Sequence, residues 1–582
     1  MFNSLIPTRP GTEPLATAFR ACRQHFVWAA VFSALVNLLY LTPTIYMMQV
    51  YDRVVPTGGM VTLYLITAVA MFALATLSGL DWLRIRLLVR AGLRLDKLLA
   101  SRVLARIVDM QQKQPAAQVM REFDTVRTAV SGQGALAIFD APWTPLYLAC
   151  CFLLHPAIGF LTLFGAIVLF VLAVLNERDS RPRLKRAIQS TNAAYAAQEG
   201  ITGQTEVVRA LGMRQASINR QIAQREQATN QYADAQFTGG KYSGIIKFLR
   251  LALQSVALGL AAYLAVKGDI SPGAIIAASV LLSRAVAPIE ALVGAWPALT
   301  QAVTSWKTLM DLFAATAGVD KPRTALPAPV GKLQVEGVSV RFPETENPQL
   351  RGVSLTLMPG QTLGVVGPSG SGKTTLARVI AGALSPNVGA VRLDGADYDA
   401  RDSDELARHI GYLPQNPSLF AGSIKDNISR FASALGATPD AIDAQAVKAA
   451  QAAGAHEMIL RLAHGYDTVL GPFGAGVSAG QAQRIALARA LYADPVLLVL
   501  DEPNSSLDQD GEIALMNAIL QAAARGASVV IIAHRAGVLQ RVDRLLSLKD
   551  GVVQIEGPRE DVLAKMRAAA PSANTVAGAR PQ

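Results

Sequence analysis

A glycine-rich segment in the second half of the chain has the residue types and spacing of a phosphate-binding loop. Residues 367–374 read GPSGSGKT, which fits the pattern G-x-x-x-x-G-K-[ST]. A strand-like run (362–366) precedes it and a helical pattern (375–383) follows. In that context backbone N–H groups and the positive end of the helix surround phosphate oxygens, Lys373 bridges the outer phosphates, and Thr374 ligates Mg²⁺. The pattern alone would suit any nucleoside triphosphatase with such a loop, or a chance glycine-rich turn.

Two adjacent carboxylates follow a strongly apolar run. Residues 496–500 (VLLVL) predict a buried strand, and Asp501 and Glu502 come at its carboxyl end, the edge where open α/β sheets bind ligands. Asp501 suits the Mg²⁺ shell, and Glu502 suits the residue that orients or deprotonates an attacking water. An acidic pair that caps a helix is the alternative interpretation.

The elements needed to position these residues are those of an α/β domain. After residue 331, runs typical of β-strands alternate with helical patterns, which favours a largely parallel sheet covered by helices. A proline-punctuated stretch, 321–331, precedes this region and is typical of a linker. The sequence therefore predicts a separate C-terminal domain that carries the candidate phosphate site.

The first half of the chain is much more apolar. Of the 582 residues 51% are hydrophobic and 17% are charged, against about 25% charged in soluble proteins, which disfavours disorder, a coiled coil or a disulfide scaffold. Because about 20 apolar residues cross the ~30 Å hydrocarbon core of a bilayer, we predict six membrane-spanning helices. The first run is too long for the apolar region of a signal peptide, so no cleaved signal peptide is expected. The apolar runs cover 26–46, 60–80, 143–175 (two spans that separate at His155-Pro156), 244–266 and 274–296.

The positive charges lie asymmetrically beside these spans. Lys and Arg are abundant before the first span, between the second and third, and between the fourth and fifth, whereas the other connections carry Arg53 and Lys267, each near an aspartate. This asymmetry predicts that the N-terminus and the C-terminal domain are both cytoplasmic. It also accounts for the net charge of +11, so no nucleic-acid partner is expected.

Six short motifs make the C-terminal region, roughly 331–565, resemble the nucleotide-binding domain of an ATP-binding cassette (ABC) protein. In order they are 367–374, Gln415, 477–481 (VSAGQ), Asp501-Glu502, 505–508 (SSLD) and His534. The resemblance implies ATP and Mg²⁺ as cofactors, Glu502 and His534 as catalytic residues, and Thr374, Gln415 and Asp501 at the metal. The nucleotide-binding residues it implies are Phe342, Gly367, Pro368, Ser369, Gly370, Ser371, Gly372, Lys373, Thr374, Thr375, Gln415, Ser478, Gly480, Gln481 and Asp508.

Individual roles follow from the resemblance. Phe342 occupies the place of an aromatic ring that stacks on adenine, Gln415 reaches the metal and touches the membrane domain, and His534 contacts the γ-phosphate. Asp508 ends the loop that faces a second subunit. In this family the 477–481 signature completes the site of the facing subunit, so one such domain per chain implies a homodimer that sandwiches two ATP molecules.

The signature departs from the usual Leu-Ser-Gly-Gly-Gln of the family. Ser478, Gly480 and Gln481 are retained, but Val477 and Ala479 replace the usual Leu and Gly. The methyl group of Ala479 stands where backbone approaches phosphate, which would weaken closure on ATP while catalytic competence is retained.

The membrane region resembles type I secretion ATPases, which push proteins through a tripartite envelope channel. The motifs that carry this resemblance are 46–56 (YMMQVYDRVVP), 139–145 (FDAPWTP) and 283–291 (SRAVAPIEA). With about 25 residues before the first span, the chain resembles the subgroup without an N-terminal peptidase domain, whose substrates carry uncleaved C-terminal signals. The implied partners are a membrane-fusion adaptor, an outer-membrane channel protein, a secreted protein and membrane lipid, and the implied location is the bacterial inner membrane.

Two charged residues lie within the apolar sixth span. Exposing Arg284 or Glu290 to lipid would cost several kcal/mol, so they either line a polar path for polypeptide or form a structural pair within the bundle. Asp52 and Arg53, at the end of the first span, are interpreted as interfacial rather than substrate-binding residues.

These observations predict a multidomain chain: an all-α transmembrane domain of six helices, of the ABC exporter type, followed by an α/β P-loop ATPase domain. The expected segments are 1–24 (cytoplasmic N-terminal segment), 25–315 (transmembrane domain), 316–331 (linker), 332–566 (ATPase domain) and 567–582 (flexible tail). The predicted function is ATP-driven export of an unfolded protein. Two alternatives stay open: an exporter of lipid, peptide or drug, and a nucleotide-gated scaffold or channel that does not hydrolyse ATP.

Overall fold

The computed structural model describes residues 10–110, 116–317, 326–342, 345, 347–533 and 536–569. The chain divides into two compact units, Met1–Lys321 and Pro322–Gln582. Each unit has hydrophobic clusters of its own.

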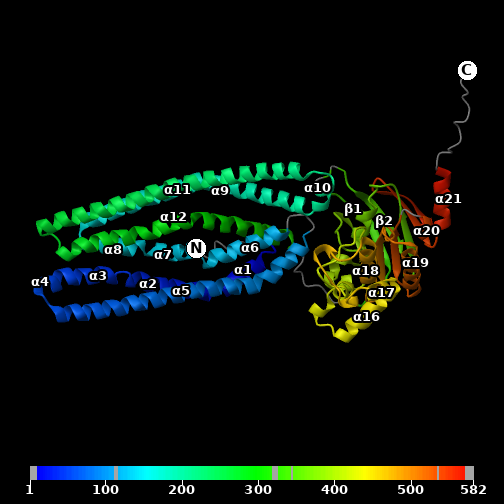
Figure 1. Ribbon diagram of the computed structural model, residues 1–582, viewed down its shortest axis with the longest axis horizontal. Coiled ribbons are helices and arrows are strands. Elements are labelled where there is room, and N and C mark those ends of the chain that lie inside the picture. The colour runs from blue at the N-terminus through cyan, green and yellow to red at the C-terminus, as the bar shows by residue number, and fades with distance from the viewer. Residues whose placement is uncertain are drawn as a thin grey trace, which may run out of the picture. The chain divides into compact units, whose positions relative to one another are not determined.

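The first unit is entirely helical over its described residues (Figure 1). Its α-helices, π-turn (η2) and 3₁₀ turn (η3) are α1 (Glu13–Ala21), α2 (Arg23–Leu39), α3 (Thr42–Gln49), η2 (Val50–Val54), α4 (Val55–Thr57), α5 (Met60–Val108), α6 (Ala116–Ser131), α7 (Gln133–Asp140), η3 (Ala141–Trp143), α8 (Thr144–Leu154), α9 (Pro156–Thr202), α10 (Thr205–Ala210), α11 (Arg214–Lys267) and α12 (Pro272–Ala315).

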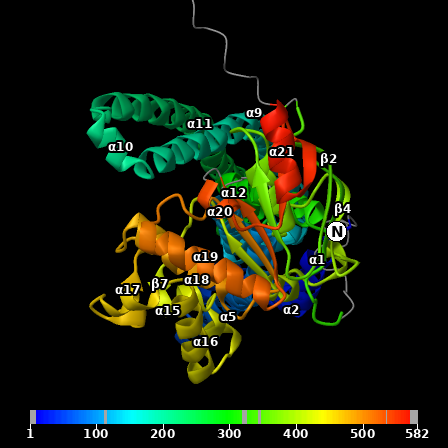
Figure 2. The same cartoon turned by 90° about the vertical axis from the view of Figure 1, so that its right-hand side faces the viewer.

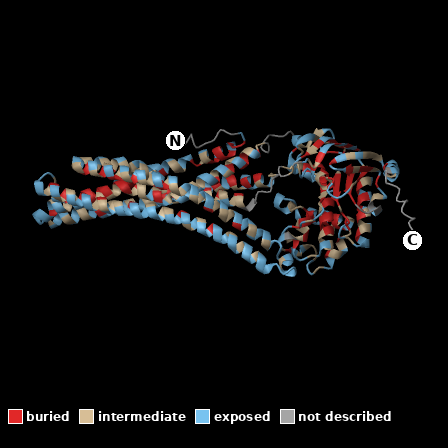
Figure 3. Cartoon of the chain, turned by 90° about the horizontal axis from the view of Figure 1, so that it is seen from above, coloured by how far each residue is buried: buried red, intermediate tan, exposed pale blue. Residues whose placement is uncertain are grey.

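Among the described residues, six helical stretches are long and apolar enough to cross a membrane, as the sequence predicts. They are Arg23–Thr57, Met60–Val108, Gln133–Leu154, Pro156–Thr202, Arg214–Lys267 and Pro272–Ala315. At 1.5 Å per residue, the 47 residues of α9 measure about 70 Å, more than twice the ~30 Å of hydrocarbon. The longest helices therefore continue well beyond the membrane core. Much of their surface is exposed in the single chain (Figure 3), including Phe72 and Phe248, which suits contact with lipid or another subunit.

The third and fourth spans separate at His155-Pro156, where the sequence places the break. Helix α8 ends at Leu154, α9 begins at Pro156, and His155 Nδ1 accepts a hydrogen bond from the Ala157 N–H at 3.1 Å. The third span begins earlier than expected, because α7 and the turn η3 precede α8 and extend the span back to Gln133.

The end of the first span is tied to the beginning of the sixth. Asp52 lies in η2 and caps α12: Oδ1 accepts the Gly273 N–H at 2.7 Å, and Oδ2 accepts the Ser271 hydroxyl at 2.6 Å. A Cβ on Gly273 would stand 2.8 Å from this carboxylate, so a larger residue there would force the Asp52 side chain to move. Negative charge at a helix N-terminus is stabilising, and the sequence alone does not reveal this partner.

Over the residues that the structure describes, the second unit is built around two larger sheets and one small ribbon (Figure 2). The six-stranded sheet has the order β12-β11-β3-β10-β9-β6 and is parallel except for β12, and the four-stranded antiparallel sheet has the order β2-β1-β4-β5. Strands β7 and β8 form the ribbon. The strands are β1 (Leu333–Val340), β2 (Leu350–Leu357), β3 (Thr362–Val366), β4 (Val388–Leu393), β5 (Ala396–Asp397), β6 (Ile410–Leu413), β7 (Gly422–Ser423), β8 (Val469–Leu470), β9 (Leu497–Asp501), β10 (Ser528–Ile532), β11 (Arg544–Lys549) and β12 (Val552–Pro558).

Helices cover both faces of the six-stranded sheet. Because successive side chains of a strand point to opposite faces, Leu498 and Leu500 of β9 pack with α18 and α19, while Leu497 and Val499 pack with α13 and the antiparallel sheet. The helices and 3₁₀ turns are α13 (Lys373–Ile380), η4 (Tyr398–Ala400), α14 (Ser403–Arg408), α15 (Ile424–Ile428), η5 (Ala432–Leu435), α16 (Pro439–Ala452), α17 (His456–Leu460), η6 (Gly465–Asp467), η7 (Pro472–Gly474), α18 (Ala479–Leu491), α19 (Gln509–Ala524), α20 (Ala536–Leu539) and α21 (Arg559–Ala569).

Candidate nucleotide-binding and hydrolysis site

Four neighbouring parallel strands deliver the candidate site residues to one edge of the six-stranded sheet. The order β3-β10-β9-β6 places the loop after Val366, Asp501 at the end of β9, and Gln415 two residues after β6 at adjacent strand ends. The carboxyl edge of an open parallel sheet is where such folds bind ligands. His534, which follows β10, lies outside the described residues.

The loop after β3 has a backbone that only glycine can adopt at its two tightest points. Gly367 has φ +158° and a Cβ there would lie 2.1 Å from the Leu548 carbonyl oxygen, and Gly372 has φ +99° with the Gln349 carbonyl oxygen at 2.6 Å. Gly370, by contrast, faces open space. The loop, which also contains Pro368, Ser369 and Ser371, leads into α13, whose first turn holds Lys373, Thr374 and Thr375. The loop therefore lies next to the positive end of a helix, which favours phosphate oxygens.

The Lys373 ammonium group lies inside this loop. It donates hydrogen bonds to the carbonyl oxygens of Gly367 at 2.9 Å and Pro368 at 2.8 Å, and the residue is 6% exposed. Burial lowers the pKa of Lys373, and the carboxylates of Glu502 and Asp501 oppose that shift. A desolvated cation whose hydrogen bonds to described residues go to neutral carbonyl groups is well suited to exchange them for phosphate oxygens.

Asp501 fits a bound divalent cation. It is fully buried, and neither carboxylate oxygen has a hydrogen-bond partner of normal geometry among the described residues. Burial raises the pKa of Asp501, while the nearby Thr374 hydroxyl acts in the opposite direction. A buried acceptor without a partner is costly, and carboxylate and hydroxyl oxygens are ligands that Mg²⁺ prefers. Asp501 and Thr374 are thus a suitable donor set for this ion.

Glu502 and Gln415 are brought into direct contact. Gln415 Nε2 donates to Glu502 Oε2 at 3.0 Å, although 87 residues separate them in the chain. The backbone of Glu502 is left-handed, with φ +49°, which costs roughly 1–3 kcal/mol for a residue other than glycine. Its N–H donates to the Ile532 carbonyl oxygen at 2.9 Å. The structure therefore places a carboxylate with a strained backbone at the same sheet edge as the phosphate-binding loop.

The signature residues lie at the beginning of α18. Ser478 caps this helix: its hydroxyl accepts the Gln481 N–H, and the Gln481 side chain accepts the Ser478 N–H. Ala479 is exposed and its φ is not positive, so its methyl group fits the helix without strain. Among the described residues, no hydrogen bond or ion pair joins Ser478, Gly480 or Gln481 to the phosphate-binding loop.

Asp508 and Phe342 have partners within the same unit. Asp508 caps α19, accepting the Gly511 N–H at 2.9 Å, and pairs with Arg484. The Gly511 N–H and then Arg484 lower the pKa of Asp508. Phe342 follows β1, is half-buried, and packs against the core formed by the antiparallel sheet and α13.

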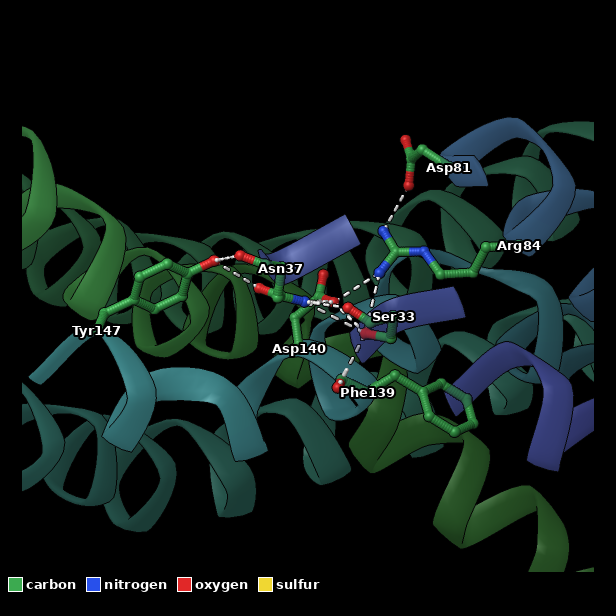
Figure 4. Close-up of polar contacts among 7 residues, drawn as sticks. All are labelled: Ser33, Asn37, Asp81, Arg84, Phe139, Asp140 and Tyr147. Carbon is green, nitrogen blue, oxygen red and sulfur yellow. Dashed lines mark hydrogen bonds and ion pairs between the residues drawn. The ribbon is translucent and has the colours of Figure 1, made fainter. Parts of the chain in front are cut away.

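The helical unit contains a buried polar cluster that the sequence did not reveal (Figure 4). Arg84 of α5 donates to Asp140 at 2.5 Å, to Asp81 at 2.6 Å and to Ser33 at 3.2 Å. Asp140 Oδ1 also accepts the Ser33 hydroxyl and the Asn37 amide. The Tyr147 hydroxyl donates to the Asn37 carbonyl oxygen and lies 2.9 Å from Asn37 Oδ1, so the cluster joins α2, α5, α7 and α8.

The two charged residues of the sixth span both have partners in the bundle. Glu290 forms an ion pair with Arg250 of α11 at 3.0 Å, and the Arg284 guanidinium lies over the Tyr40 ring at 4.1 Å from its centroid. Neither contact joins Arg284 to Glu290; each residue instead has a partner elsewhere in the bundle. A role in a polypeptide path stays a prediction.

Two family models match this chain, one in each of its two units. The family model for the ABC transporter matches residues 350–505, and the model for the ABC transporter transmembrane region matches residues 26–288. The type I secretion system ATP-binding protein PrsD of Rhizobium meliloti is 42% identical over 559 residues, covering 95% of this chain and 94% of that protein. The chain belongs to the ABC transporters, in the type I secretion ATPase family.

A more distant relative and a solved structure agree with this assignment. The alpha-hemolysin translocation ATP-binding protein HlyB of Escherichia coli is 28% identical over 564 residues, covering 93% of this chain and 77% of that protein. A bacterial Atm1-family ABC exporter with ATP bound has the same fold, with a TM-score of 0.79 over 95% of this chain and 22% identity. This ABC transporter is therefore a multi-pass membrane protein with an exporter fold, whose ATP-binding domain is an ATPase coupled to transport.

Proposed function

We propose that this ABC transporter is the ATPase of a type I secretion system and moves an unfolded protein with a C-terminal signal from the cytoplasm to the exterior. The observation that carries the proposal is the 42% identity to a type I secretion ATP-binding protein, which extends over both the membrane unit and the ATPase unit. The partners in this proposal are a membrane-fusion adaptor, an outer-membrane channel protein and the secreted protein. The location is the bacterial inner membrane, with the basic connections and the ATPase domain in the cytoplasm.

In this proposal two copies of the chain complete each other's ATP sites. Ser478, Gly480 and Gln481 have no described contact with the phosphate-binding loop of their own chain, and they stand at a helix N-terminus, which favours anions. In the homodimer they would meet the γ-phosphate of ATP held by the facing loop. Asp508 would lie at the same dimer interface, and Phe342 would stack on the adenine.

Within one site, different residues would bind the phosphates, hold the metal ion and activate the attacking water. Lys373 and the backbone of the loop would hold the phosphates, and Asp501, Thr374 and Gln415 would hold Mg²⁺. The bound metal ion would neutralise charge on the phosphates and polarise the terminal phosphoryl group. Glu502 would orient and deprotonate the attacking water, with His534 at the γ-phosphate.

The test combines turnover with secretion. Glu502→Gln in the full-length protein should retain ATP binding and lose about 10²–10⁴-fold in Mg²⁺-dependent hydrolysis, and Glu457→Gln, at an exposed position on α17, serves as the matched control. A strain that carries only the Glu502→Gln form should also stop secreting the cargo protein. Wild-type hydrolysis by Glu502→Gln would refute the role of Glu502. Normal secretion of proteins in a strain without this transporter would refute protein export and favour a lipid, peptide or drug.

A further inference from the structure

The loop that carries Glu502 has little regular structure of its own. Between the end of β9 and the start of α19, residues 503–506 form turns, and Glu502, which precedes them, has the left-handed backbone described above. Within the loop, the Ser505 N–H donates a hydrogen bond to the Glu502 carbonyl oxygen at 3.2 Å. The backbone position of this loop therefore depends on contacts from outside it, while Gln415 contacts the Glu502 side chain directly.

One buried side chain of the signature helix makes four of the hydrogen bonds that hold this loop from outside. Gln483 is 2% exposed, and both ends of its amide bond to the loop. Nε2 donates to the Pro503 carbonyl oxygen at 2.5 Å, with longer contacts to Ser505 Oγ at 3.3 Å and to the Glu502 carbonyl oxygen at 3.4 Å. Oε1 accepts the Ser506 N–H at 2.9 Å.

The position of Gln483 on α18 is one where a core helix would ordinarily have an apolar residue. Ala486, Leu487 and Ala490, at i+3, i+4 and i+7, are all buried, so Gln483 lies on the apolar stripe of the helix. A buried amide is tolerated only where its hydrogen-bonding groups are used. Here they are used entirely on the loop that follows the catalytic strand.

Two neighbouring contacts show that the first turns of α18 fit closely on this loop. A Cβ on Gly480 would stand 3.0 Å from the Ser506 carbonyl oxygen, and Arg484 pairs with Asp508. The Asp508 side chain of that ion pair is 65% exposed, so solvent screens the pair. Among the α18 residues that contact this loop, Gln483 is the buried one, and it donates hydrogen bonds to the carbonyl oxygens of Glu502 and Pro503.

We propose that Gln483 is a positioning residue for ATP hydrolysis, which fixes the Glu502 carboxylate by holding residues 502–506 through both ends of its buried amide. The proposal rests on the proposed role of Glu502. Gln483 makes no described contact with the phosphate-binding loop, so its loss should affect the chemical step and leave nucleotide binding in place.

The primary test is Gln483→Met in the full-length protein, because methionine has a similar length and no amide. We expect kcat to fall by about tenfold to 100-fold, since a misplacement of about 1 Å has effects of that size, with KM for ATP and binding of a fluorescent ATP analogue unchanged. Gln445→Met, at an exposed position of α16, is the matched control and should behave as wild type.

A second variant separates positioning from a general loss of structure. Gln483→Glu keeps the acceptor for the Ser506 N–H, and its carboxyl group can donate to the Pro503 carbonyl oxygen only when protonated. Its kcat relative to wild type should therefore rise as the pH is lowered, whereas the ratio for Gln483→Met should stay constant.

The outcomes distinguish this inference from the proposed function. Unchanged kcat in Gln483→Met, or a kcat loss matched by an equal loss of ATP-analogue binding, would overturn the inference. So would a Gln483→Glu ratio that does not respond to pH. If Glu502→Gln hydrolyses ATP like wild type, the proposed role of Glu502 is refuted. If Glu502→Gln is inactive while Gln483→Met has a normal kcat, only the positioning role of Gln483 is refuted.

Discussion

Replacing Asp140 by Asn should destabilise the helical unit by about 3 kcal/mol, because it removes the principal counter-ion of a buried arginine. The Arg84 side chain is 5% exposed and lies 2.5 Å from Asp140, which is 22% exposed. Removing one partner of a buried ion pair costs about 3–5 kcal/mol. Asp81 remains 2.6 Å from Arg84 but is 33% exposed, so partial compensation places Asp140→Asn near the lower end of that range.

The geometry also predicts an order among variants. Asp140→Ala should be worse than Asp140→Asn, since it removes the oxygen that accepts from Ser33 and Asn37 as well. The double variant Arg84→Met/Asp140→Leu should recover much of the loss, because a buried ion pair can often be replaced by apolar residues at little cost. Asp234→Asn, which breaks an exposed pair with Arg183 at 2.8 Å, should cost under about 1 kcal/mol.

Thermal unfolding of the full-length protein in detergent, followed by tryptophan fluorescence, measures these differences. If the helical unit follows the 2–4 °C per kcal/mol of soluble domains of 150–250 residues, Asp140→Asn should lower Tm by roughly 6–12 °C. A Tm equal to that of Asp234→Asn would refute the reasoning. So would a double variant that is as unstable as the two single variants combined.

Three further predictions concern residues described above. Asp501→Asn should raise the Tm of the protein without nucleotide and Mg²⁺ by the equivalent of about 1–3 kcal/mol at neutral pH. Burial raises the pKa of Asp501, so the charged carboxylate costs stability above that pKa, and the gain in Tm should shrink as the pH falls and the wild-type carboxylate takes up a proton. A gain in Tm that is the same at every pH would contradict this cause. Ala479→Gly should hydrolyse ATP at least as fast as wild type in a steady-state assay, because in the proposed dimer it would restore the small residue where backbone approaches phosphate. A slower rate would show that the methyl group does not hinder closure. Asp52→Ala should lower Tm by the equivalent of about 1 kcal/mol through loss of the α12 cap, while Asp269→Ala, at an exposed position before the same helix, should have little effect.

The features predicted correctly from the sequence are those set by local patterns. Strand β3 covers Thr362–Val366, the same residues that the apolar run predicts, and helix α13 starts within the motif that follows. The spans follow from uncharged runs, and His155-Pro156 separates two of them because proline favours the first turn of a helix.

The features that could not be predicted depend on contacts between distant parts of the chain. Arg84 and Asp140 are 56 residues apart, and Tyr147 and Asn37 are 110 apart, so no local spacing reveals either pair. Gln483 did leave a signal, namely a polar residue at a position of helical apolar spacing, but its partners on the loop become evident only in three dimensions.

The contact between Asp52 and the start of α12 has a consequence for how the protein is made. The two halves of this cap are separated by 219 residues, so at about 5–20 residues per second a ribosome needs roughly 10–45 s to supply the second half after the first. During that interval the Ser271 and Gly273 partners of Asp52 have not yet been synthesised. The contact between the first and sixth spans can therefore form only after the last helix of the membrane unit has been made.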